Sequence, residues 1–209
     1  MDSTDAADLI AELHEEKAEQ EAATRFRNRA ALLIAFLAAV LAIGGLGGGN
    51  ATDAMIATNI HASDTWAFYQ AKNVRQTLYR VAADEIEASL AAGGLSGPAR
   101  ASAEARLKDY RAKIAQYDSE PDKAASGDPT KGEGKKQLTA RAKAYEAERD
   151  IANAQDGNFD LAEVLLQLAL VLGSVAILAI NRWILLTSAA LGIAGSLLTL
   201  NGFLLLVPL

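Results

Sequence analysis

Residues 30–49, AALLIAFLAAVLAIGGLGGG, form an apolar stretch that contains no Lys and no Arg. Two more stretches of this kind lie near the C-terminus: LAEVLLQLALVLGSVAILAI at 161–180 and WILLTSAALGIAGSLLTLNGFLLLVPL at 183–209. Each is about as long as the ~20 residues that a helix needs to cross a hydrocarbon core of ~30 Å. The pattern predicts an all-α membrane protein with a transmembrane span at 30–49, two closing spans within 160–209, and a polar region at 50–159.

The charged residues of this 209-residue chain, whose formal net charge is −6, lie almost entirely outside these stretches. Residues 1–29 carry more acids than bases, and the two signs nearly balance over 50–159. Neither segment has the concentrated positive charge of a nucleic-acid-binding protein, so that class is excluded. The chain has no cysteine, which excludes disulfides and thiolate metal sites.

The arginines next to the spans predict the orientation. Arg25, Arg27 and Arg29 precede the first span, and Arg182 lies between the second and third. With three spans these positions fall on one side, which the positive-inside rule makes cytoplasmic. We therefore expect a bacterial inner-membrane protein with a cytoplasmic acidic tail helix at 1–29 and with 50–159 in the periplasm.

Five glycines close the first span: Gly44, Gly45, Gly47, Gly48 and Gly49. Glycine disfavours a helix by about 1 kcal/mol relative to alanine, so the run is consistent with a helix break at the membrane surface. It is equally consistent with a smooth face on which another helix packs closely. The sequence leaves both alternatives open.

A long helix is expected from about 52 to 92, where neither Pro nor Gly occurs. Near-heptad spacing predicts a buried coiled-coil seam on its apolar residues: Ile56, Ile60, Ala67, Ala71, Val74, Leu78, Val81 and Leu90. The same helix carries an aromatic collar of Trp66, Phe68 and Tyr69, which fits either a packing cluster or a recognition surface for another protein.

The chain is expected to return to the membrane as a broken helix. Gly and Pro at 93–98 predict a turn, followed by helices at 99–117 and 135–155. The polar segment 118–134 between them, rich in Pro and Gly, predicts a mobile loop. Ala-rich helices bury little apolar surface alone, so the pattern favours a homo-oligomer.

No motif indicates catalysis, a cofactor or a metal site. The two histidines, His14 and His61, have no convergent partners by spacing, whereas a metal site needs three or four ligands. We therefore expect a protein that is not an enzyme.

Asp160, Glu163 and Gln167 form a stripe that runs into the second span. Acids within a span usually face protein or water, so the stripe is a candidate pore lining in an oligomer. Alternatively, Asp160 and Glu163 cap the start of a helix at the level of the lipid headgroups, and this interpretation is preferred because a helix start at Asp160 favours an acid.

Small residues recur on one face of the third span, at Ser188, Gly192 and Ser196. Such spacing lets helices approach closely in lipid, and Ala169 and Gly173 on the second span are candidates for the matching surface. We expect these residues to pack helix against helix and to contribute to self-association.

The segment ASDTWAFYQAKNVRQTLY at 62–79, after a span that ends in GGGNAT, resembles a family of small bacterial membrane proteins described only as a domain of unknown function. The resemblance runs from about residue 30 onward. It implies three retained spans and a bacterial source, and it brings no activity, ligand or catalytic residue.

These observations favour a self-associating scaffold or accessory protein of the inner membrane, in contact with lipid and without a cofactor. The first alternative is a channel or transport component lined by the Asp160 stripe. The second is an envelope sensor or adaptor. It would bind a protein partner through the acidic tail or through the extramembrane helical hairpin that residues 50–159 are expected to form.

Overall fold

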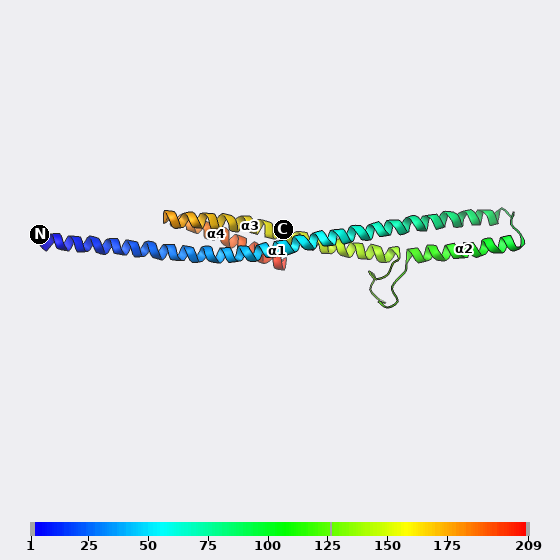
Figure 1. Cartoon of the computed structure of the whole chain (residues 1–209), viewed down its shortest axis with the longest axis horizontal. Coiled ribbons are helices and arrows are strands. Elements are labelled where there is room, and N and C mark those ends of the chain that lie inside the picture. Colours follow the sequence, from blue (N-terminus) through cyan, green and yellow to red (C-terminus); the bar gives the residue numbers. More distant parts are fainter. Residues whose placement is uncertain (1–2, 126, 208–209) are drawn as a thin grey trace. The chain divides into compact units, whose positions relative to one another are not determined.

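The computed structural model describes residues 3–125 and 127–207, and within these ranges the chain is helical, with no strand. Four helices account for most of it (Figure 1): α1 (Ser3–Ala91), α2 (Gly97–Asp118), α3 (Lys135–Ala179) and α4 (Arg182–Leu204). Three of them, α1, α3 and α4, contain stretches long and apolar enough to cross a membrane. The expected fold class is thus confirmed at the level of an all-helical chain with three candidate spans.

Helix α1 joins three expected segments into one helix of 89 residues. The tail helix, the first span and the long helix after it are continuous, so the glycine run does not break the helix. Asn50 and Thr52, which follow the glycine run, lie inside the helix. The side chains of residues 3–12 lie outside the described ones.

The chain divides into two compact units, and α1 and α3 each contribute to both. Unit 1 comprises the residues up to Asp53 and those from Ala152 onward; unit 2 comprises Ala54–Ile151. Unit 1 therefore holds the three apolar stretches, and unit 2 holds most of the polar region between them.

In unit 1 the first part of α1, the second part of α3 and α4 lie side by side (Figure 1). Its core is built around Leu37 of α1 with Leu166 and Ala169 of α3. The α3–α4 link is tight: Ile180 has a positive φ of 48°, and the Asn181 side chain accepts hydrogen bonds from the backbone N–H groups of Trp183 and Ile184. Asn181 therefore acts as the N-cap that starts α4.

In unit 2 the second part of α1 is followed by α2 and the start of α3. The turn between α1 and α2 uses Gly93 and Gly97 at φ values of 73° and 56°, a region that glycine enters without strain. Pro98 occupies the first turn of α2, where a missing N–H costs nothing. The turn expected at 93–98 is therefore confirmed, and the backbone preferences of Gly and Pro account for it.

Candidate functional site

Of the eight apolar residues expected to form a buried seam on α1, Leu90 is half-buried and the other seven lie on the outer surface of the helix. We call this set the aliphatic stripe: Ile56, Ile60, Ala67, Ala71, Val74, Leu78 and Val81. All seven are exposed, and the five large side chains are between 50% and 65% exposed. The near-heptad spacing on α1 therefore marks an exposed surface, which no other part of the described chain covers.

The face of α1 that packs within unit 2 follows a different heptad series. Its buried members are Ala62, Lys72, Gln76 and Ala83, with Tyr69 and Tyr79 half-buried among them. The Gln76 side chain donates to the carbonyl of Ile114 on α2 at 2.8 Å, and Tyr79 stacks against Tyr110 and Tyr117. Hydropathy could not reveal this seam, because alanine, tyrosine and the methylenes of lysine supply its packing.

In the aromatic collar, Trp66 and Tyr69 pack within unit 2, whereas Phe68 lies at the surface. Trp66 donates its indole N–H to Glu146 of α3 at 2.8 Å, and its ring meets Tyr69 edge-on with centroids 5.5 Å apart. Phe68 remains 38% exposed, and the Lys72 ammonium lies 5.1 Å from its ring centroid. Trp66 and Tyr69 therefore serve mainly to pack unit 2.

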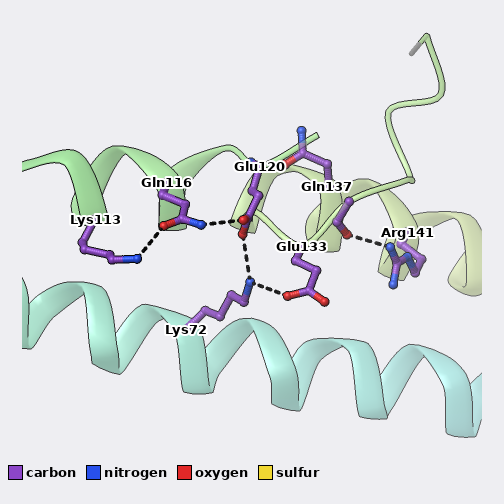
Figure 2. Close-up of polar contacts among 8 residues, drawn as sticks. Lys72, Lys113, Gln116, Glu120, Glu133, Gln137 and Arg141 are labelled. Atoms are coloured by element: carbon purple, nitrogen blue, oxygen red, sulfur yellow. Dashed lines mark hydrogen bonds and ion pairs between the residues drawn. The ribbon is translucent and has the colours of Figure 1, made fainter. Parts of the chain in front are cut away.

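Lys72 is the centre of the polar network in unit 2 (Figure 2). Its side chain is only 6% exposed, and its ammonium group lies 3.3 Å from Glu133 and 3.6 Å from Glu120. The ring of Tyr117 lies on its other side, at 5.9 Å. Since Glu120 and Glu133 stand at the two ends of the polar loop, one buried cation ties both ends of that loop to α1.

Both stems of the loop are also bonded to one another. The backbone N–H of Glu133 donates to the Glu120 carbonyl at 3.0 Å, and the Gln137 side chain accepts from the Glu120 N–H. Arg141 donates to the carbonyls of Thr130 and Gly132. These contacts bond the stems of 118–134 to one another and to α1, and the tip around Asp128 lies between them; the mobility expected of this loop stays a prediction.

At that tip, Asp128 accepts hydrogen bonds from the hydroxyl and the backbone N–H of Thr130. These bonds stabilise the carboxylate and hold the pKa of Asp128 below its usual value. The tip thus carries a turn of its own.

The small residues of α4 pack inside unit 1. Ser188 is fully buried and donates to the Ala169 carbonyl of α3 at 2.6 Å. A Cβ added at Gly192 would lie 2.6 Å from Leu37 of α1. Ser196 is half-buried and donates to the carbonyl of Gly192 in its own helix. Ser188 and Gly192 therefore join helices of one chain, and their spacing no longer argues for a second copy.

The glycine run of α1 packs closely on α3 and α4. A Cβ at Gly47 would collide with the rings of Phe159 and Phe203, and Gly44 faces Thr199. Gly45 and Gly49 meet nothing within 4 Å. Of the two alternatives, the structure thus shows close packing, because glycine alone leaves room for the phenylalanine rings.

Two polar pairs at one end of unit 1 escaped the sequence analysis. The Asn201 amide of α4 donates to Asn158 of α3 at 2.7 Å, and Thr52 of α1 donates to Asp156 of α3 at 2.7 Å. Asn158 is buried, so its pairing satisfies a group that would otherwise be costly. Isolated asparagines give no sequence signal, since only the fold brings them together.

Asp160, Glu163 and Gln167 all lie exposed on the outer surface of α3. The helix begins at Lys135, so Asp160 is deep inside it and does not cap its start; that interpretation was wrong. The Gln167 amide donates to Glu163 at 2.7 Å. Leu166, next to Gln167, packs on Gly195 of α4. Gln167 therefore lies at the same level along the helices as the middle of α4, on the outward face of α3.

The histidines do not converge on other ligands among the described residues. No group of three or more His, Asp or Glu side chains in that part of the chain could hold a metal ion. His61 stacks on Tyr145 of α3 with ring centroids 5.3 Å apart, which gives it a packing role in unit 2.

Comparison with known proteins gives a family and no activity. No curated protein and no solved structure matches the chain. A family model described as "Domain of unknown function (DUF4337)" matches residues 26–205, which include all four helices except the first part of α1. The chain therefore belongs to the DUF4337 family.

Proposed function

We propose that this protein is a self-associating scaffold or accessory protein of a bacterial inner membrane and is not an enzyme. Unit 1 would anchor it through three spans, with the segment 1–29 in the cytoplasm. Unit 2 would stand in the periplasm and present the aliphatic stripe of α1 to a partner. The arginines next to the spans support this orientation.

The aliphatic stripe is the observation that carries the proposal. Five large aliphatic side chains lie along about 38 Å of one helix face at the usual rise per residue, and each is at least half exposed. Burying a Val, Leu or Ile side chain completely gives about 1.5–3 kcal/mol, so even half of that at five positions is substantial. Exposed apolar stripes of this extent commonly mark contact surfaces.

Anchoring in a membrane favours contact between copies. Chains confined to one membrane meet at a high effective concentration, so a weak surface contact becomes significant. A scaffold needs only such contacts, whereas a catalyst needs a convergent set of reactive groups.

The test is the mass of the full-length particle in mild detergent and its response to charge in the stripe. We expect the natural chain, 22.0 kDa, to form particles of two or more copies. Val74→Glu with Leu78→Glu should shift them to one copy, because two charges would have to be buried. Ile151→Glu is the matched control, since Ile151 is an exposed isoleucine of unit 2 outside the stripe. Single-copy particles of the natural chain would refute the proposal.

A channel or transport component is the second candidate, and the position of Glu163 and Gln167 favours it. They lie outward on an apolar stretch of α3, with Gln167 beside the middle of α4. A carboxylate exposed to lipid is costly, so such groups usually face protein or water. Cation flux into liposomes that falls on Glu163→Gln, while Leu168→Gln leaves it unchanged, would support this function; no flux from oligomeric protein would exclude it.

A further inference from the structure

We infer that the aliphatic stripe pairs with the same stripe of a second copy as a parallel, in-register, two-stranded coiled coil centred on residues 67–81. This inference rests on the self-association proposed above and specifies its geometry. It assigns to α1 two faces with separate partners, one inside the chain and one between chains.

The first argument is spacing. Five residues of the aliphatic stripe, Ala67, Ala71, Val74, Leu78 and Val81, alternate by four and three residues, and Asp64 and Ile60 continue the same alternation toward the N-terminus. This is the a/d pattern of a two-stranded coiled coil, and every one of these residues is exposed. An exposed face with no partner has no need for a strict repeat, whereas a helix that winds around its own copy requires one.

The second argument is orientation. The stripe begins at Ile56, a few residues after the first candidate span ends, so in each copy the N-terminal end of the stripe is tied closely to the membrane. Copies in one membrane share their orientation, because the same flanking charges orient each of them. Two stripes that meet therefore run parallel.

The third argument is the chemistry of the flanking positions. In a parallel, in-register pair, Gln70 lies beside Arg75 of the second copy, where an amide oxygen can accept from a guanidinium. Both side chains are exposed in the single chain. The other flanking positions between 56 and 82 bring no two like charges together. Charge repulsion at these positions therefore does not oppose pairing anywhere along this segment.

The fourth argument is where the apolar core ends. Asp64 and Glu85 occupy the a positions on either side of the run from Ala67 to Val81, and both are exposed. In the parallel pair each of these carboxylates faces its own copy, and like charges so placed repel. The two acids therefore limit the tight contact to about two heptads, or about 21 Å of helix.

Disulfide crosslinking of the full-length protein in membranes tests this geometry, and the natural chain contains no cysteine to interfere. Single cysteines at Ala67 and at Val81 mark the two ends of the contact. In a parallel pair each should crosslink to itself, which shifts the band from the mass of one chain to that of two. A cysteine at Ile151 is the control and should stay at the mass of one chain.

The alternative outcomes separate the two proposals. An antiparallel pair would leave both single variants uncrosslinked but join the Ala67 variant to the Val81 variant when they are co-expressed, and this result would overturn the inference while self-association stood. Oligomeric particles with no crosslink in either experiment would also overturn the inference alone. Single-copy particles would overturn both proposals.

Replacing the acid at the edge of the core gives an independent measurement. Asp64→Leu should tighten dimerisation roughly fivefold, because it removes a like-charge contact and extends the apolar core by one a position. Lys113→Leu, at an exposed position on α2, should leave dimerisation unchanged. If Asp64→Leu leaves dimerisation unchanged or weakens it, the proposed register is wrong.

Discussion

Replacing Lys72 by alanine should release the loop of unit 2 from α1. The ammonium group contributes ion pairs with Glu120 at 3.6 Å and Glu133 at 3.3 Å, and a cation–π contact with the ring of Phe68. The carboxylates are 38% and 69% exposed, so solvent screens each ion pair to at most about 1 kcal/mol. A cation–π contact adds about 0.5–1 kcal/mol. We expect the free energy of local opening to fall by about 2 kcal/mol, since such contributions are not fully additive.

Hydrogen–deuterium exchange of the full-length protein measures this opening. The reporters are the backbone N–H groups of Glu133 and Asp122, which bond the two stems of the loop together. A loss of about 2 kcal/mol makes their exchange about thirtyfold faster, because each 1.4 kcal/mol is a factor of ten. Lys108→Ala, which removes an exposed lysine of α2 away from the Lys72 network, is the control and should change nothing.

Lys72→Met distinguishes charge from packing. Methionine retains most of the buried stem and removes the ammonium, and replacing a buried charge by an apolar group often costs little. We expect exchange to rise by less than half as much, on a logarithmic scale, as in Lys72→Ala. If Lys72→Ala leaves the exchange of the stem amides unchanged, the buried lysine does not hold the loop and the reasoning fails.

Three further predictions concern unit 1 and its placement. Gly192→Leu should lower the melting temperature of the full chain, with a cost of about 1–3 kcal/mol, because it forces a large side chain against α1; an unchanged melting temperature would contradict the packing. Ser188→Ala removes a buried hydrogen bond to the Ala169 carbonyl and should cost about 1 kcal/mol, measured by unfolding in detergent. A single cysteine at Ala124 should react with an impermeant reagent in intact spheroplasts, and protection there would reverse the proposed orientation.

The sequence predicted helix class and turns well, because both depend on local chemistry. Apolar length gave the three candidate spans, and Gly and Pro gave the turn before α2. It did not decide the joints within helices. The run from Gly44 to Gly49 was consistent with a break or with a packing face, and it continues as helix because packing against Phe159 outweighs the local preference of glycine.

The sequence predicted candidate sites only where residue size or hydropathy repeats at helical spacing. The spacing of Ser188 and Gly192 marked a packing face, but spacing cannot say whether the partner helix belongs to the same chain. The network around Lys72 gave no signal, because Glu120 and Glu133 reach it from distant positions and only the folded loop brings them together. Contacts of this kind depend on tertiary structure, which single-sequence patterns do not encode.

The two faces of α1 within unit 2 differ in the kind of residue they carry. The inner face closes unit 2 with alanine, tyrosine, Lys72 and Gln76, so small and polar side chains supply much of its packing. The outer face carries Ile60, Val74 and Leu78, which gain most from leaving water. A chain that had to be stable only as a single copy would gain more by the reverse arrangement, with its aliphatic residues inside. The observed placement leaves the aliphatic face available to a partner, which is the arrangement that the self-associating scaffold proposed above would need.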